Sequence, residues 1–381
     1  MRLLSGFNEE WGIEASRREY IERILSDVMR SCNYERISIP VIEPFSSYTE
    51  AVVGKSPWPE WNEKCIFKFD INNYYKCYES FDNSITSVCL IPEGTVSITR
   101  WLASMVEAGE TVPKRLFYSL KCYRNELIST LTDTKSREFQ QFGVEILDSA
   151  DIQSDIEIIK IVVFLLTSLG IKENLIRVRI NDVALFNRLV NDCHIQPDDV
   201  ISLKKDLDYL AECYAGKHSE DYAQTQINIH HTLSNYHIAE QQMRVWNAII
   251  NHSYQNINEA KSIYPSCYQQ DFLSLEKVFT FFTNCSSKIE LDLSVIRSHQ
   301  YYSGLSFEVD VISGRERYYE IAGGGRYDRL VGAFLRANDK SSTLSIPCTG
   351  FAFGMDRILS MANDLGLLNG KKELYSVFNF K

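Results

Sequence analysis

Two hydrophobic periodicities alternate along this chain, and together they restrict its fold more than any other feature of the sequence. Apolar residues recur at helical spacing over residues 13–29 and 151–169, which predicts long amphipathic helices. Residues 176–181 and 305–312 instead alternate between apolar and polar, as strands do. We therefore expect an α+β fold, with a largely antiparallel sheet flanked by helices.

Two further stretches predict strands with distinct positions. Residues 116–123 and 144–147 read as the arms of a hairpin whose long, charged tip spans residues 125–136. Residues 37–41 alternate as a strand would, but Pro40 interrupts them. Because proline cannot donate a ladder hydrogen bond, we expect this strand at a sheet edge or an interface.

The composition excludes several classes of protein. Apolar residues make up 45% of the 381-residue chain and charged residues 24%, a balance typical of folded globular proteins. The longest apolar run, residues 161–166, is far shorter than the roughly 20 residues that cross a bilayer. No apolar segment of signal-peptide length follows the N-terminus. We therefore expect a cytoplasmic protein without a membrane segment.

The charge balance argues against a general affinity for nucleic acid. The chain has 40 Lys and Arg against 50 Asp and Glu, so its net charge is -10. Non-specific binding to nucleic acid depends on neutralising phosphates with basic side chains. A local basic site can still bind a nucleic acid on such a protein.

Cysteines and histidines do not form a metal-binding pattern. None of the ten cysteines pairs with another at C-x-x-C spacing, which zinc and redox sites use. His230, His231 and His237 have no cysteine or carboxylate at ligand spacing to complete a set. We expect no metal site built from protein side chains alone, and mostly buried, reduced cysteines.

Several short segments combine charged residues with glycines where a plain core strand would have neither. They are Pro92–Thr95, Arg124–Glu126 with Arg137–Glu145, Arg297 with Tyr301–Gly304, and Gly350–Arg357. A single arginine at the end of a strand is usually a surface residue, so each segment alone is weak evidence. The run Gly323–Gly325 alone predicts a tight turn, because glycine adopts positive φ easily. Neither a Walker loop nor a Rossmann G-x-G-x-x-G occurs.

Taken together and in this order, the segments resemble the class II aminoacyl-tRNA synthetases, and within them the histidyl-tRNA synthetase branch with its paralogues. Residues 34–43 are similar to motif 1, Arg124–Glu126 to motif 2, and Gly354–Arg357 to motif 3. The signals specific to the branch are Pro92–Thr95, Gln141-x-x-x-Glu145, Arg297-x-x-x-Tyr301-Tyr302 and Gly324–Asp328. The resemblance covers nearly the whole chain.

The resemblance implies an aminoacyl-adenylate-forming ligase that uses ATP and Mg²⁺. Arg124 would hold the α-phosphate, Arg357 the γ-phosphate, and Arg297 the α-phosphate together with the reacting carboxylate. Glu126 and Phe139 would seat the adenine, and Mg²⁺ would bridge the phosphates. Arginine suits this task because its planar fork stays charged and binds phosphate oxygens in two places.

The resemblance also implies an amino-acid pocket, with histidine as the leading substrate. Glu93, helped by Thr95 and Gln141, would bind the α-amino group. Two further residues, Glu145 and Tyr302, would surround the imidazole, which offers one donor and one acceptor when neutral and two donors when protonated. The remaining amino-acid-binding residues are Arg297, Tyr301 and Tyr327.

The same resemblance gives a domain organisation and a partner. Residues 1–183 would form the first part of the catalytic core with motifs 1 and 2, and 289–381 its second part with motif 3. The helical stretches 184–214, 234–253 and 272–282 lie within 184–288, which we expect to be a helical insertion. Motif 1 would form the interface of a homodimer, as the position of Pro40 suggests.

The chain also departs from the family pattern. Because the sequence ends soon after Arg357, we expect no C-terminal anticodon-binding domain. Ile91 replaces an arginine, Ser298–Gln300 replace Gly-Leu-Asp, and Leu127–Ser129 replace Arg-Pro-Gln in the motif 2 loop. In the family this loop approaches the tRNA acceptor end, so the acceptor is the most open part of the assignment.

Three functions therefore stay open. The first is ATP-dependent activation of histidine with transfer to tRNA or another acceptor, and the arginines Arg124, Arg297 and Arg357 favour such chemistry. The second is a non-catalytic regulatory paralogue that binds histidine and activates an ATP phosphoribosyltransferase. The third is a stand-alone ligase that loads a carrier protein or small molecule. The sequence is also compatible with the truncated core of a longer synthetase.

Overall fold

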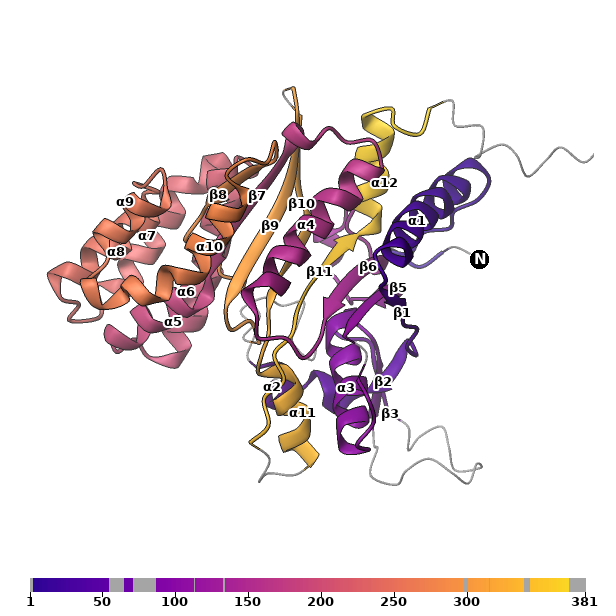
Figure 1. Ribbon diagram of the computed structural model, residues 1–381, viewed down its shortest axis with the longest axis horizontal. Coiled ribbons are helices and arrows are strands. Elements are labelled where there is room, and N and C mark those ends of the chain that lie inside the picture. Colours follow the sequence, from indigo (N-terminus) through magenta and orange to yellow (C-terminus); the bar gives the residue numbers. More distant parts are fainter. Residues whose placement is uncertain are drawn as a thin grey trace, which may run out of the picture.

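The computed structural model describes residues 3–54, 65–70, 87–112, 114–132, 134–297, 301–314, 316–338 and 343–369. Within these residues the chain folds around an eight-stranded sheet of order β1-β5-β6-β11-β10-β9-β7-β8 (Figure 1). Neighbours are antiparallel except for β1 with β5 and β7 with β8. The strands are β1 (Glu35–Arg36), β5 (Arg115–Tyr123), β6 (Glu138–Ile146), β7 (Ile176–Asp182), β8 (Lys288–Leu291), β9 (Leu305–Ser313), β10 (Glu316–Arg326) and β11 (Thr349–Gly354).

Three helices cover one face of this sheet. Helices α4 (Ile152–Ser168) and α12 (Met355–Asp364) contact β6, β10 and β11, and α1 (Ile13–Ser31) packs on both helices (Figure 1). Asp151 caps the N-terminus of α4, and its side chain accepts a hydrogen bond from the amide of Gln153 at 3.0 Å. Such a cap satisfies an amide that would otherwise lack a partner within the helix.

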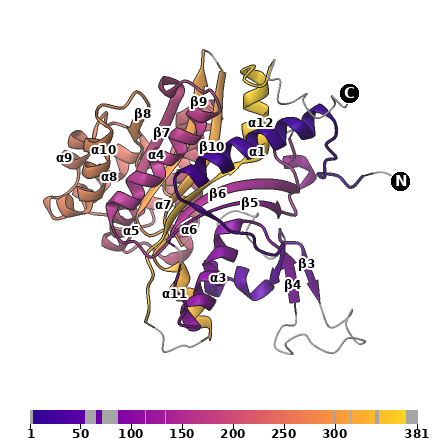
Figure 2. The ribbon, with the colours of Figure 1, turned by 45° about the vertical axis from the view of Figure 1, so that its right-hand side comes forward.

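The opposite face carries shorter elements and a second sheet. Helix α3 (Gly94–Glu107) contacts β5 and β6, and α11 (Leu330–Asn338) contacts α3 and α2 (Glu50–Val53). The second sheet has the order β2-β4-β3, with β2 (Ile42–Pro44), β3 (Lys68–Asp70) and β4 (Ser87–Leu90). Figure 2 shows α3, α11 and this sheet together beneath β5 and β6.

Six α-helices in the described part of the chain connect β7 to β8 and lie beside that end of the sheet (Figure 1). They are α5 (Val183–Asp192), α6 (Pro197–Ala215), α7 (Tyr222–Leu233), α8 (Glu240–Ile250), α9 (Ile257–Ile263) and α10 (Leu273–Phe282). A parallel strand pair requires a crossover connection, which these helices provide.

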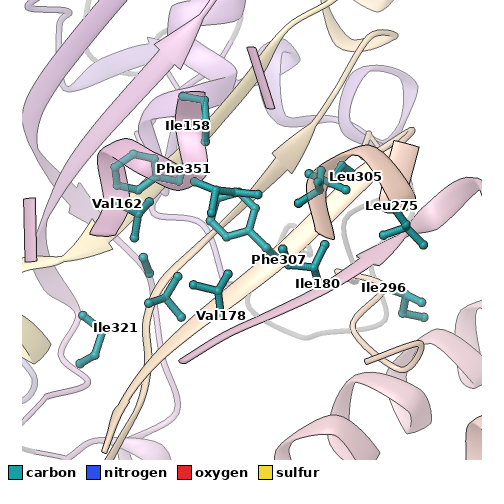
Figure 3. Packing of buried hydrophobic residues seen from close by; sticks show 14 of the residues in the cluster. Ile158, Val162, Val178, Ile180, Leu275, Ile296, Leu305, Phe307, Ile321 and Phe351 are labelled. Atoms are coloured by element: carbon teal, nitrogen blue, oxygen red, sulfur yellow. The ribbon is translucent and has the colours of Figure 1, made fainter. Parts of the chain in front are cut away.

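Strand alternation divides the buried apolar side chains between the two faces. Figure 3 shows Ile158 and Val162 of α4 beside Phe351 of β11, in the larger cluster that also contains Phe307 of β9. Leu116 and Tyr118 of β5 belong to the cluster on the opposite face, with residues of α3 and α11. No helix among the described residues combines the length and apolar character needed to cross a membrane.

Most predicted elements are confirmed, and two predictions are wrong. The hairpin is present as β5 and β6, although its second strand begins earlier, at Glu138. Residues 37–41 do not form one strand: β1 ends at Arg36 at the edge of the large sheet, and β2 begins at Ile42 at the edge of the small one. Pro40 lies between them, where the chain changes sheets.

The glycine run is the second correction. Gly323, Gly324 and Gly325 do not form a turn but lie in the middle of β10, paired with both β9 and β11. Close approach explains the glycine at position 323, because a Cβ atom there would lie 2.7 Å from Nη1 of Arg297. Glycine at this position therefore leaves room for the Arg297 side chain above the strand.

Candidate active site

The polar face of β6 places several predicted residues side by side. Phe142 and Val144 point into the larger apolar cluster, so Phe139, Gln141 and Glu145, which alternate with them, lie on the opposite face. Phe139 packs there against the cluster that includes α3. Alternation in a single strand thus brings an aromatic ring, an amide and a carboxylate to one surface.

Glu145 lies at the bottom of this surface and is fully buried. Its Oε1 accepts hydrogen bonds from Thr95 at 2.9 Å and from Tyr118 at 3.5 Å, and its Oε2 accepts one from Tyr327 at 2.6 Å. Burial raises the pKa of Glu145 to about 8, although the hydroxyl donors oppose the shift. A cationic ligand would favour the ionised form of this carboxyl group.

The backbone of β11 leaves the space that this carboxylate fills. Gly350 pairs with Glu145 in the register of β11 and β6. A Cβ atom on Gly350 would lie only 1.6 Å from Oε2 of Glu145. A glycine at this position is therefore a condition for the buried carboxylate.

Glu93 is the second buried carboxylate of the site, with 6% of its surface exposed. The phenol of Tyr301 lies 3.2 Å from each of its carboxylate oxygens. Burial raises the pKa of Glu93 to about 7, while Arg124, Tyr301 and Arg297 oppose the shift. Next to Glu93, the amide of Gly94 donates to Oε1 of Gln141 at 3.0 Å.

Arg124 follows the last residue of β5 and turns toward the same surface. Its Nε donates to the carbonyl of Pro92 at 3.1 Å, and its guanidinium carbon lies 5.0 Å from the ring centroid of Phe139. Glu126, two residues later, is buried and lies 3.3 Å from Nζ of Lys135. Phe139 and Glu126 are the residues predicted to seat the adenine. Phe139 lies close to Arg124 in space, and Glu126 lies close to it in the chain.

Arg297 is held in an uncommon backbone conformation, with φ of 46°, which non-glycine residues seldom adopt. Its Nη1 lies 3.0 Å from Oε1 of Glu308. Its Nε is buried and has no hydrogen-bond partner among the described residues. A buried donor without a partner is unfavourable, and an anionic ligand such as a phosphate or carboxylate would satisfy it.

Arg357 lies in the first turn of α12 and contacts Glu320 of β10. Its Nη1 donates to the carbonyl oxygen of Glu320 at 2.7 Å and lies 3.3 Å from the carboxylate Oε2. Burial would raise the pKa of Glu320, but Lys217, Arg357 and Arg297 hold it well below its ordinary value. Arg297 thus acts electrostatically on both Glu93 and Glu320.

Glu93 and Glu320 link electrostatically the three arginines that the sequence singled out. Glu93 interacts with Arg124 and Arg297, and Glu320 interacts with Arg297 and Arg357. Tyr302 lies beside them, with its ring centroid 4.8 Å from that of Tyr301. The residues predicted to bind ATP and the amino acid therefore gather in one region, although their individual roles stay predictions.

Sequence reasoning missed Tyr118, Glu308 and Glu320 in this region. Glu308 had no signal of its own, because it takes an ordinary polar position in an alternating strand. Tyr118 had none, since an aromatic residue in a strand is ordinary core. Ser298–Gln300, where the sequence departs from the family pattern, lie outside the described residues.

The described residues contain no group of three or more His, Cys, Asp or Glu side chains placed to hold a metal ion. Glu308 and Glu320 are each paired with arginine. The buried donor on Arg297 and the aromatic face of Phe139 beside Arg124 fit a nucleotide better than they fit an isolated cation.

Comparison with known proteins agrees with this architecture. Residues 6–358 match the family model of histidyl-tRNA synthetase. The chain therefore belongs to the histidyl-tRNA synthetase family, whose fold is that of the class II aminoacyl-tRNA synthetases. Family membership places it among proteins of aminoacylation and supports a ligase.

The relatives are distant in sequence but similar over most of their length. The chain is 25% identical to a histidine–tRNA ligase of Saccharolobus islandicus over 369 residues, which cover 94% of this chain and 75% of that protein. It is 26% identical to a histidine–tRNA ligase of Sulfolobus acidocaldarius over 366 residues, covering 95% and 75%.

Two solved structures share the fold. One is described as an ATP phosphoribosyltransferase regulatory subunit/histidyl-tRNA synthetase from Bacillus halodurans, with a TM-score of 0.70, 20% identity and coverage of 95% of this chain and 83% of that one. The other is a histidine–tRNA ligase subunit from Alicyclobacillus acidocaldarius, with a TM-score of 0.67, 19% identity and coverage of 96% and 98%.

Proposed function

We propose that this protein activates histidine with ATP to form histidyl adenylate and then transfers the histidyl group to an acceptor, for which tRNA is the first candidate. The observation that carries the proposal is the arrangement of two buried carboxylates, Glu93 and Glu145, next to three connected arginines. Buried carboxylates suit a cationic amino acid, and arginines suit phosphates.

The amino-acid side of the proposal rests on the two glutamates. Glu93, with Gln141 and Thr95 close by, binds the α-ammonium group. Glu145, with Tyr302 and Tyr327, binds the imidazole. Burial raises the pKa of Glu93 to about 7 and of Glu145 to about 8, and a cationic group bound beside either carboxylate would favour its ionised form.

The nucleotide side rests on the arginines and the aromatic face. Phe139 stacks on the adenine and Glu126 makes a polar contact with it. Arg124 and Arg297 hold the α-phosphate, while Arg357 holds the γ-phosphate. Bound Mg²⁺ supplies further neutralisation of the phosphates.

The chemical step needs positioning and charge neutralisation rather than a protein nucleophile. A carboxylate oxygen of histidine attacks the α-phosphorus of ATP, a new P–O bond forms, and the bond to the β-phosphate oxygen breaks as pyrophosphate leaves with its electron pair. Arg297 brings the two anions together in this proposal, and its buried Nε, which has no hydrogen-bond partner among the described residues, supports that role.

The acceptor depends on the motif 2 loop. Leu127 and Ile128 are 60% and 67% exposed in this loop. These apolar side chains stand where polar ones would contact the end of a tRNA. Family membership supports tRNA as the first candidate acceptor, and a carrier protein or small molecule is the alternative acceptor.

The test is pyrophosphate exchange into ATP by the purified protein, measured without tRNA, with each of the twenty amino acids and with none. Exchange that requires histidine supports the proposal. Exchange with another amino acid keeps the adenylation chemistry and refutes the pocket assignment. Incubation of the active protein with ATP, labelled histidine and total tRNA then tests the acceptor.

A second candidate is the regulatory paralogue that binds histidine and activates an ATP phosphoribosyltransferase. The shared fold with the Bacillus halodurans protein, whose description names that role, favours it. Histidine binding by calorimetry without any exchange would select this function over the first.

Further expectations from the sequence belong to the same proposal. Residues 1–183 and 289–381 form the catalytic core and residues 184–288 an insertion. Val41 and Ile42 of the motif 1 segment are 37% and 56% exposed, and covering them would favour the predicted homodimer. Sedimentation velocity tests that dimer, and the cytoplasmic location stays a prediction.

A further inference from the structure

Helix α6 ends in a way that directs Lys217 toward the sheet. Gly216 follows the helix in a left-handed conformation with φ of 100°, which favours glycine. The amide of Lys217 then donates to the carbonyl of Glu212 in the last turn at 3.0 Å. The chain reverses at this point, and the next side chain reaches out of the helical segment toward β10.

The ammonium group of Lys217 reaches the nucleotide region. Its Nζ lies 2.7 Å from Oε1 of Glu212 and 3.3 Å from Oε2 of Glu320. Nη1 of Arg357 also lies 3.3 Å from that same Oε2. One carboxylate oxygen is therefore shared by two cations, one from the helical segment and one from motif 3.

Glu320 is fixed from several sides. The pairing of β9 with β10 shifts register between Tyr318 and Ala322, and Glu320 has φ of 46° within this irregularity. Its amide donates to Oδ1 of Asp310 at 2.9 Å, and its carbonyl accepts from Arg357. A bulge of this kind re-aims a side chain, and here it aims the carboxylate at both cations.

The charges decide what this arrangement does to Arg357. With Glu320 ionised, Arg357 and Glu320 alone would form a neutral pair with little attraction for a phosphate. Adding Lys217 restores one positive charge to the group. Glu212 is a further carboxyl group on the other side of Lys217, and burial together with Glu320 raises its pKa to about 7. Burial opposes the charge on Lys217, but the two carboxylates outweigh it and raise its pKa.

We propose that Lys217 is a positioning residue of the nucleotide site. It neutralises Glu320, so that the positive charge of Arg357 stays available for the terminal phosphate of ATP. This inference rests on the proposed function, because it needs Arg357 to bind a phosphate. It gives the segment between β7 and β8 a direct part in adenylation.

The experiment measures KM for ATP and kcat in pyrophosphate exchange with saturating histidine at pH 6, where Glu212, whose pKa is about 7, is mostly protonated and does not cancel the charge of Lys217. Lys217→Met should raise KM for ATP by about tenfold, which is the effect of losing roughly one partly screened charge interaction, and should change kcat much less. Lys217→Arg, which keeps the charge, should stay near the parent. Lys277→Met, at an exposed position of α10, is the matched control and should change neither constant.

The decisive variant is the double substitution Lys217→Met with Glu320→Gln. It removes one positive and one negative charge, so KM for ATP should return toward the parental value. Lost packing at Lys217 would not be repaired in this way. If Lys217→Met does not fold, Lys217→Gln takes its place with the same expectations.

The outcomes separate this inference from the proposed function. A parent protein without exchange and without ATP binding refutes the proposed function and the inference with it. A parent protein with exchange, together with an unchanged KM in Lys217→Met or no recovery in the double variant, refutes only the role of Lys217.

Discussion

The phenol of Tyr301 lies at the same distance, 3.2 Å, from both carboxylate oxygens of Glu93. One hydroxyl group cannot donate to two oxygens at full strength, so it stabilises the whole carboxylate rather than one of its oxygens. The pKa of Glu93 is about 7 because burial outweighs the effects of Arg124, Tyr301 and Arg297. A small change at Tyr301 therefore moves the ionisation of Glu93 within the physiological range.

We expect Tyr301→Phe to move the pH dependence of histidine binding upward. Loss of the hydroxyl removes a donor to the ionised form, so the pKa of Glu93 rises, by about one unit for a hydrogen bond to a charged group. Because the α-ammonium group needs the ionised carboxylate, binding at pH 7 should weaken and should recover toward pH 9. Calorimetric titration with histidine between pH 6 and 9 measures this shift. Tyr214→Phe, in α6, is the control, and an unchanged pH midpoint in Tyr301→Phe contradicts the prediction.

The free energy of unfolding of the empty protein should fall as the pH rises, because Glu145 is buried. Its carboxyl group has a pKa of about 8 in the folded protein and about 4.3 in the unfolded chain. Between these values the folded state binds one more proton, so the free energy of unfolding falls with increasing pH. Glu145→Gln removes this titration and should stabilise the empty protein, by an amount on the order of 5 kcal/mol at pH 8 and about 1 kcal/mol at pH 5.

Urea unfolding of Glu145→Gln and of the parent at pH 5, 6, 7, 8 and 9 measures this difference. The difference in free energy of unfolding should grow up to about pH 8 and then level off. The same variant should bind histidine at least tenfold more weakly while ATP binding changes little, because the imidazole loses its carboxylate. A difference in stability that does not vary with pH, or equal losses for both ligands, would show that Glu145 has another role.

Much of the fold and part of the site could be predicted from local patterns. Alternation in β6 was enough to place Gln141 and Glu145 on one face, because side chains in a strand follow a period of two. The relation between Lys217, Glu320 and Arg357 could not be predicted in this way. It depends on a register shift in β10 and on the left-handed end of α6, and each of these is decided by tertiary packing. The strand expected at 37–41 failed for a similar reason, since local alternation does not reveal that the chain leaves one sheet for another.

Two adjacent glycines of β10 should respond differently to alanine. In Gly323→Ala the new methyl group would meet the end of the Arg297 side chain at 2.7 Å, whereas in Gly324→Ala it would meet the carbonyl oxygen of Gly350 at 2.3 Å. A flexible guanidinium can move, but a backbone in the centre of a sheet cannot. Gly323→Ala should therefore keep its stability and lose exchange activity by about tenfold or more, while Gly324→Ala should unfold more easily, by roughly 1–3 kcal/mol. Thermal unfolding and exchange assays on both variants decide this, and equal stability losses would refute it.

Arg357→Ala should abolish adenylate formation while the protein stays folded. The guanidinium is partly exposed, and its hydrogen bonds to described residues are made to Glu320, so its loss opens no cavity in the core. Loss of one positioned charge that stabilises a transition state typically reduces turnover by about 10²–10³-fold. Pyrophosphate exchange at saturating ATP measures the effect, with circular dichroism as the test of folding. Arg244→Ala is the control, because in the described part of the chain Arg244 pairs with an exposed Glu240 on α8. Near-normal turnover in Arg357→Ala would show that motif 3 is assigned to the wrong residues.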